Sequence, residues 1–194
     1  MNLKETIVHE SLKLFSLNGF LGTSIQDILS AAKTSKGGFY NHFSSKEDLF
    51  HQVLDESRKI WRERNLAGLA EEADAVGKIK KLLANYRDRY LLDAENFPGG
   101  CIFILFTVEL GDSRPHLSRE VQQGFVGLKA MIKNFLDEGR DAGDFALGID
   151  TDLATEILFN GMLGAAVNYS ADKSFDTLDH SINALIDYVD DLKR

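Results

Sequence analysis

The stretch that decides the fold of this chain is Lys33-Thr-Ser-Lys-Gly-Gly-Phe-Tyr-Asn-His-Phe43. It follows Ser24-Ile-Gln-Asp-Ile-Leu-Ser-Ala-Ala32, in which apolar residues recur at helical spacing. Phe39 and Phe43 are four residues apart and form a second apolar stripe, so we expect two short helices that share a small core. Two short helices joined by a tight turn are typical of the helix-turn-helix, which places its second helix in the major groove of DNA.

The outward face of the predicted second helix is suited to contact with DNA. Its lysine, tyrosine and histidine side chains can bond phosphates or base edges, and its two glycines let the backbone approach the bases. Serine or threonine precedes each short helix as a capping residue, and a lysine opens the next, longer helix, whose free N–H groups favour a phosphate. The residues expected near DNA are Thr23, Ser24, Thr34, Ser35, Lys36, Gly37, Gly38, Tyr40, His42 and Lys46.

Another helix is predicted in front of this unit. Leu3, Ile7, Leu14 and Phe15 lie on one helical face, and Gly19 occupies a position where glycine commonly ends a helix. The sequence therefore predicts a compact three-helix module that runs into a fourth helix.

At these residues the chain resembles the N-terminal domain of the TetR family of ligand-responsive transcriptional regulators. The resemblance covers roughly residues 1–50, and many positions match in order. It implies an all-α protein, with a helix-turn-helix DNA-binding domain in residues 1–46 and a helical effector-binding and dimerisation domain in residues 47–194. The matching residues are Leu14-Phe15, Gly19-Phe20, Thr23-Ser24-Ile25, Ile28, Ala31-Ala32, Ser35-Lys36-Gly37, Phe39-Tyr40, His42-Phe43 and Ser45-Lys46-Glu47-Asp48-Leu49.

The chain departs from the family pattern in the turn between the two short helices. The family usually has Gly-Val there, and this chain has Lys33-Thr34. A positive φ at this turn costs a lysine some strain that a glycine avoids, so Lys33 is interpreted either as tolerated strain or as a slightly different turn. Either form adds a charge near the DNA phosphates.

The net charge of −8 is unevenly distributed along the chain. In residues 1–50, five lysines balance five acidic residues, so the whole excess of negative charge lies in residues 51–194. Lys33, Lys36 and Lys46 surround the predicted second helix, with no acidic residue between positions 28 and 46. This local basic face favours DNA contact, and such binding weakens with salt.

The remaining chain reads as a series of helices separated by short connections. The clearest break contains Pro98 followed by two glycines. No apolar stretch is long enough to span a membrane and no export signal is visible, so we expect a soluble, cytoplasmic protein with no membrane partner. Helices are expected near 46–66, 75–93, 101–111, 116–140, 151–170 and 175–192, with connections at 65–77, 96–100 and 142–150.

The last two predicted helices have the pattern of an interface. Small residues in the first of them permit close helix packing, and apolar residues recur at threes and fours along the second. The resemblance implies a homodimer, in which two recognition helices about 34–36 Å apart read a palindromic operator. The alternative is a stripe buried within one chain. The expected interface residues are Gly161, Gly164, Ala165, Phe175, Leu178, Ile182, Leu185, Ile186 and Val189.

Large apolar residues in the middle of the chain are candidates for an effector pocket, although aromatic residues at helical spacing often form packed core instead. The resemblance implies a small effector, often a hydrophobic one in this family, that binds in this region and relieves DNA binding. Repression is the family's default behaviour, with activation as the alternative. The candidate pocket residues are Trp61, Tyr86, Tyr90, Phe103, Phe106, Thr107, Phe125, Phe159 and Asn160.

Two other classes of function are alternatives. A helical enzyme would be built on Glu109, Asp112 and His116, but no nucleophile, phosphate loop or complete metal set accompanies them, and no cofactor is expected. A helical adaptor would use the helix-turn-helix to bind protein. The single cysteine, Cys101, is interpreted as an inert buried thiol, with an oxidant sensor as the alternative.

Overall fold

A computed structural model of the chain describes residues 1–193. Those residues form helices with short connections and contain no β-strand, which confirms the predicted all-α fold. Contacts within the chain define two compact units, each built from two separate stretches of sequence. Unit 1 combines Met1–Trp61 with Asp93–Val121, and unit 2 combines Arg62–Leu92 with the chain from Gln122 onward.

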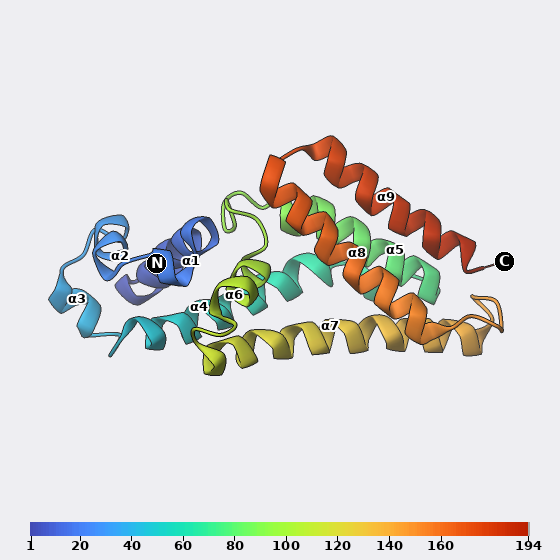
Figure 1. Cartoon of the computed structure of the whole chain (residues 1–194), viewed down its shortest axis with the longest axis horizontal. Coiled ribbons are helices and arrows are strands. Elements are labelled where there is room, and N and C mark those ends of the chain that lie inside the picture. The colour runs from blue at the N-terminus through green and yellow to red at the C-terminus, as the bar shows by residue number, and fades with distance from the viewer. Residues whose placement is uncertain (194) are drawn as a thin grey trace. The chain divides into compact units, whose positions relative to one another are not determined.

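Unit 1 contains the helix-turn-helix. Its first helices are α1 (Leu3–Gly22), α2 (Ile25–Ala31) and α3 (Lys36–Tyr40), which follow one another in Figure 1. Phe39 is fully buried and Phe43 is almost so, as expected for the small core predicted from their spacing. The predicted helical module is therefore present.

Unit 1 also includes parts of the chain beyond this module. These are the first part of α4 (Lys46–Asn65), α6 (Ile102–Leu110) and the start of α7 (Pro115–Ala142). A cluster of phenylalanine rings joins α1, α4 and α6, because the apolar faces of all three helices meet there. The predicted domain boundary after residue 46 falls inside this unit. The ring pairs and their centroid separations are Phe15–Phe20 at 5.6 Å, Phe15–Phe106 at 6.1 Å, Phe20–Phe50 at 5.3 Å and Phe50–Phe106 at 4.9 Å.

The path of α1 is broken at Gly19. This glycine has φ 75° and ψ 171°, a backbone conformation that is essentially restricted to glycine. The sequence predicts the end of the helix at this glycine, and the structure instead shows a break followed by one more turn, to Gly22. The carboxylate of Glu109 lies where a side chain on Gly19 would be, so both backbone geometry and space require glycine.

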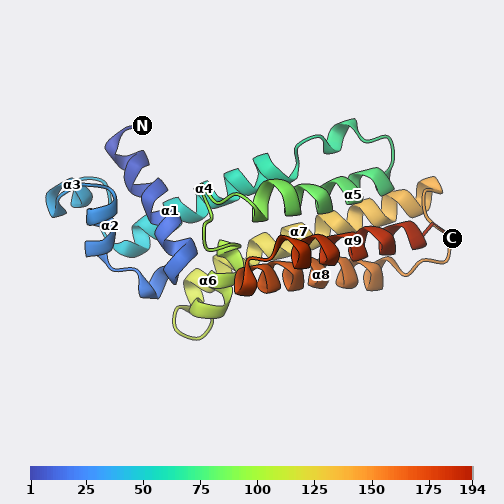
Figure 2. The same cartoon turned by 90° about the horizontal axis from the view of Figure 1, so that it is seen from above.

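Unit 2 contains α5 (Ala75–Asn85), α8 (Thr151–Asp172) and α9 (Phe175–Asp191), together with the rest of α7 and a short 3₁₀ turn, η1 (Leu69–Glu71). The helix α9 packs against both α8 and α5, and Figures 1 and 2 show α8 and α9 side by side. The apolar stripes of these helices form the core of the unit.

A single helix was predicted over residues 75–93, and the structure divides it. After α5 the backbone widens into a π-helical segment, η2 (Tyr86–Leu91). Tyr86 and Tyr90 are both buried in this segment, with their rings stacked at 5.6 Å. A π-type turn holds an extra residue, which apolar spacing alone does not reveal.

We expect Gly19→Ala to lower the free energy of unfolding by about 1–3 kcal/mol, because alanine is strained at this backbone conformation and its methyl group displaces Glu109. Urea unfolding of the purified protein measures the change. Gly22→Ala is the matched control, since a methyl group there meets only Asn18, at 3.9 Å. Equal stability of the two variants would contradict the requirement for glycine at position 19.

Candidate nucleic-acid interface

The start of α2 is fixed by reciprocal hydrogen bonds. The Ser24 hydroxyl accepts from the backbone N–H of Asp27 at 3.1 Å, and the Asp27 carboxylate accepts from the backbone N–H of Ser24 at 2.8 Å. Hydrogen bonds from the Ser24 hydroxyl and backbone hold the pKa of Asp27 below its usual value. Ser24 therefore caps α2, as expected from the serine or threonine that precedes this short helix.

The start of α3 has a simpler cap. The Ser35 hydroxyl accepts a hydrogen bond from the backbone N–H of Gly38 at 3.1 Å, which satisfies one of the free donors of this short helix. A side chain on Gly38 would meet the Thr34 hydroxyl, so a larger residue would require Thr34 to move. The polar residues before α3 thus hold the helix in place and remain accessible at the surface.

The turn between α2 and α3 contains the residue that departs from the family pattern. Lys33 has φ 49°, one of two positive values found for residues other than glycine within positions 1–193. The backbone N–H of the next residue, Thr34, donates to the carbonyl of Leu29 at 3.0 Å, which closes the turn. Of the two interpretations offered for Lys33, the left-handed conformation is the one present, and its side chain is exposed.

The outward face of α3 is open to solvent. Lys36 and Gly37 are exposed, and Tyr40 is 52% exposed although it is a large aromatic residue. On the opposite face Phe39 is fully buried and anchors the helix, with its ring 5.2 Å from that of Tyr40. His42 is also exposed, in the turn after α3. These residues present hydrogen-bond donors and a cation on one surface.

One predicted DNA contact needs correction. Thr23 is only 1% exposed, and its hydroxyl donates to the carbonyl of Gly19 at 2.7 Å. Its side chain therefore stabilises the end of α1 and presents no surface to a phosphate. In the sequence, the hydroxyls of Thr23 and Ser24 are equally suited to capping α2, and only the path of α1 distinguishes them.

Lys46 has a position that sequence reasoning missed. Its ammonium group donates to the carbonyl oxygens of Phe20 at 2.8 Å and Thr23 at 2.9 Å, and lies over the Phe20 ring. Burial lowers the pKa of Lys46, and the nearby Glu109 carboxylate opposes that shift. A phosphate contact by Lys46 stays a prediction, because its ammonium already has two protein acceptors.

The aromatic residues predicted for an effector pocket are distributed over both units. In unit 1, Phe106 is fully buried between Phe15 and Phe50, so it belongs to the core under the helix-turn-helix, and its assignment to the pocket is corrected. The Thr107 hydroxyl donates to the Phe103 carbonyl within α6. In the sequence, the apolar character of Phe106 does not show whether it belongs to the core or to a pocket. Trp61 and Phe103 also lie in unit 1.

The candidate pocket residues in unit 2 are partly core and partly surface. Tyr86 and Tyr90 are buried in η2, and the rings of Phe125 and Phe159 meet edge to face at 6.0 Å between α7 and α8. Asn160 is exposed, which removes it from an enclosed pocket. Its position follows from the helical register of α8, which turns this residue outward.

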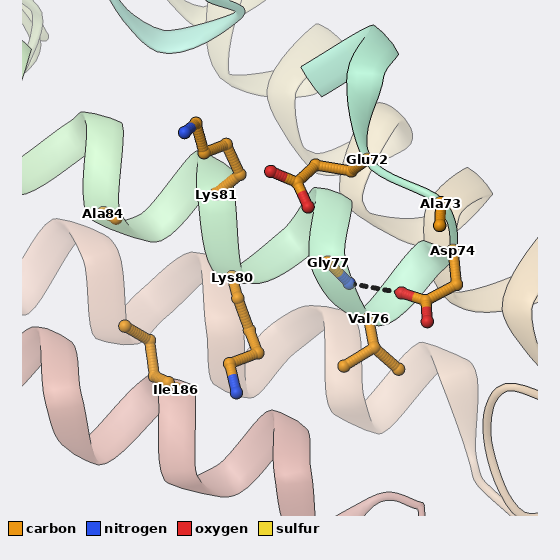
Figure 3. A pocket seen from close by; sticks show the side chains of 9 residues that line it. All are labelled: Glu72, Ala73, Asp74, Val76, Gly77, Lys80, Lys81, Ala84 and Ile186. Atoms are coloured by element: carbon orange, nitrogen blue, oxygen red, sulfur yellow. Dashed lines mark hydrogen bonds between the residues drawn. The ribbon is translucent and has the colours of Figure 1, made fainter. Parts of the chain in front are cut away.

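Unit 2 also has an open surface depression, with a volume of about 560 Å³. Figure 3 shows it beside the start of α5, with charged side chains of both signs around it and Ile186 of α9 at one side. None of the residues predicted for the effector pocket lines it. An open depression of this polarity offers little enclosed apolar surface to a hydrophobic effector. Its lining residues are Glu72, Ala73, Asp74, Val76, Gly77, Lys80, Lys81, Ala84 and Ile186.

Most residues predicted for a dimer interface are buried within the single chain, and their assignment is corrected. A side chain on Gly161 would meet Leu185 of α9, so this face of α8 packs internally. The reason is that a helical stripe does not identify its partner, and here the partners are α5 and α8 of the same chain. Ile186 is half-buried, and Gly164 and Phe175 are exposed. The buried residues are Ala165, Leu178, Ile182, Leu185 and Val189.

The residues considered for catalysis do not form a common site. Both carboxylate oxygens of Glu109 accept backbone N–H groups of α1, whereas His116 pairs with Glu47 at 3.2 Å. Across residues 1–193, no group of three or more potential ligands is placed to hold a metal ion.

Within the same residues, no helix combines the length and apolar character that membrane crossing requires. Cys101 is buried at the start of α6.

Comparisons with known proteins agree with this architecture. Residues 7–53 match the sequence model described as bacterial regulatory proteins of the tetR family, and residues 75–185 match that of the tetracyclin repressor-like C-terminal domain. The HTH-type transcriptional repressor DhaR of Mycobacterium sp. (strain GP1) is 27% identical over 95% of this chain and 91% of its own length.

Solved structures show the same fold. A TetR transcriptional regulator from Chloroflexus aurantiacus matches with a TM-score of 0.88 and 28% identity, over 97% of this chain and 94% of that one. The TetR family regulator CifR, a cysteine mutant complexed with operator DNA, matches with a TM-score of 0.78 and 21% identity, over 94% of each chain.

Proposed function

Because the chain belongs to the TetR family and is a transcriptional regulator, we propose that it represses transcription as a homodimer on a palindromic operator and is released by a small, hydrophobic effector. The observation that carries the DNA-binding part is the exposed face of α3. Lys36, Gly37 and Tyr40 are open to solvent there, while Phe39 holds the helix to the core. Such a face suits contact with phosphates and base edges.

The proposed dimer interface uses the outward face of α8 in place of the buried stripe of α9. Leu153, Ile157 and Val167 are 56%, 38% and 49% exposed, and their spacing places them on one side of the helix. Gly164 lies on the same side, and a side chain there would meet nothing within 4 Å. Exposed apolar groups around a glycine allow a second α8 to approach closely.

Release by an effector requires two states of the protein that bind DNA unequally. An effector shifts DNA affinity only as far as its own affinities for those states differ. We propose α4 as the connecting element, because this one continuous helix begins next to the helix-turn-helix at Lys46 and ends in unit 2 at Asn65. Repression is favoured over activation because DhaR, a relative that is similar over nearly the whole chain, is a repressor.

Selection of duplexes from a random DNA pool tests DNA binding. We expect the native protein to enrich a palindrome, and Lys36→Ala/Tyr40→Ala to enrich none, because the double variant removes a cation and a hydrogen-bonding ring from the α3 face. Lys59→Ala is the control, since it removes an exposed lysine from α4. Enrichment of the same palindrome by the double variant would favour another DNA-binding face. No enrichment by folded native protein would leave either a DNA binder that needs its effector or a function without DNA.

Gly37→Ala separates contact with DNA from folding. The methyl group would meet only the Ser35 hydroxyl, at 3.7 Å, and alanine is the better helix former by about 0.8–1.0 kcal/mol. We therefore expect unchanged or higher stability in urea but weaker binding to the selected duplex in fluorescence anisotropy, because the backbone of α3 must come close to the bases. Unchanged affinity would contradict that close approach.

Leu153→Lys/Ile157→Lys tests the dimer interface. Two charges on the outward face of α8 would be buried unpaired in a dimer, so sedimentation velocity should show monomers where the native protein is dimeric. Leu147→Lys is the control, because Leu147 is 87% exposed and precedes α8. A dimeric double variant would exclude this face as the interface.

A further inference from the structure

Three contacts from outside the helix-turn-helix meet the second half of α1, and all three lie within unit 1. In the connection before α6, Gly99 lies so close to Ser16 that a side chain would collide with its backbone. The Phe106 ring of α6 packs on Phe15 at 6.1 Å. The third contact is made by the carboxylate of Glu109, one helical turn further along α6.

Glu109 binds the backbone of α1 where that helix is broken. Its two carboxylate oxygens accept from the N–H groups of Phe20 and Leu21, each at 2.7 Å. These donors follow Gly19, whose non-helical conformation frees them from the hydrogen bonding of the preceding turns. A carboxylate at such a position caps the following turn, and charge-assisted hydrogen bonds of this kind are stronger than neutral ones.

The same turn is bound from a second direction by Lys46. Its ammonium donates to the carbonyls of Phe20 and Thr23, so the backbone of Phe20 is bound by Glu109 through its N–H and by Lys46 through its carbonyl. The Thr23 carbonyl immediately precedes Ser24, the capping residue of α2. An anion from α6 and a cation from α4 therefore fix the backbone that leads into the helix-turn-helix.

We propose that Glu109 is a positioning residue for DNA binding, which acts from α6 by holding the end of α1 and so the placement of α2 and α3. The proposal rests on the proposed function and extends it to a residue outside the DNA-contacting face. Gly19 leaves the space that the carboxylate occupies, and Lys46 completes the arrangement from α4. Removal of Glu109 should therefore reduce selective DNA binding although the variant touches no DNA contact.

The negative charge of Glu109 and its contact with α1 have opposite expected effects on DNA affinity, so an experiment can separate them. Loss of a negative charge by itself should strengthen binding to any duplex, because DNA is an anion. Loss of a positioning contact should weaken binding to the selected duplex and leave non-specific binding unchanged or slightly stronger. The ratio of specific to non-specific affinity is therefore the decisive measurement.

The experiment compares Glu109→Ala with Glu109→Gln and with Asp112→Ala as control. Asp112 is an exposed acid three residues further on, so its removal changes the charge equally without touching α1. Fluorescence anisotropy would measure affinity for the selected duplex and for a random-sequence duplex of equal length. We expect Glu109→Ala to lower the affinity ratio about tenfold or more, Glu109→Gln to lower it less because one carbonyl oxygen remains as an acceptor, and Asp112→Ala to leave it unchanged.

Amide hydrogen exchange at Phe20 and Leu21 supplies a second readout, since both N–H groups should lose protection in Glu109→Ala. An unchanged affinity ratio in Glu109→Ala would overturn the proposal. If that variant proves unfolded in thermal melts, Glu109→Gln decides, and an unchanged ratio there overturns it equally. If the native protein itself selects no duplex, the proposed function fails and the positioning role fails with it. If the native protein binds selectively and the Glu109 variants keep the same affinity ratio, only the positioning role of Glu109 is rejected.

Discussion

The packing of phenylalanine rings among α1, α4 and α6 is the contact on which the rest of unit 1 depends. Phe20 and Phe50 meet edge to face, and Phe106 of α6 completes the cluster against Phe15 and Phe50. Rings of this size bury large apolar areas, and their edge-to-face and tilted contacts restrict how the helices can shift. Phe106, more than fifty positions after the helix-turn-helix in the sequence, thus packs in the core that supports it.

Burial at this cluster creates a second requirement, which is met by charge. Where α1 breaks at Gly19, its backbone N–H and carbonyl groups need partners, since unpaired polar groups are costly away from water. Glu109 supplies the acceptor and Lys46 the donor. Apolar packing brings the three helices together, and the ion contacts then select one arrangement of the chain that enters α2.

Apolar residues at helical spacing are buried in some helices of this regulator and exposed in others. The apolar stripe of α9 is buried against α5 and α8, and the face of α8 left open carries Leu153, Ile157 and Val167. In α3 the same principle leaves Tyr40 outward while Phe39 is buried. Apolar spacing alone therefore does not show which face of a helix is buried within its own chain and which remains exposed.

The sequence by itself determined the all-α fold and most helix positions, because these follow from local spacing and capping. Its matching residues carried the resemblance to the TetR family, and it left the turn at Lys33 open between two interpretations. Only the tertiary structure decided which side chains remain available: it buried Thr23 and the α9 stripe, placed Phe106 under the helix-turn-helix, and joined Glu109 to Gly19. The physical reason is that burial and long-range hydrogen bonds depend on which helices meet, and a single helix's periodicity carries no record of its neighbour.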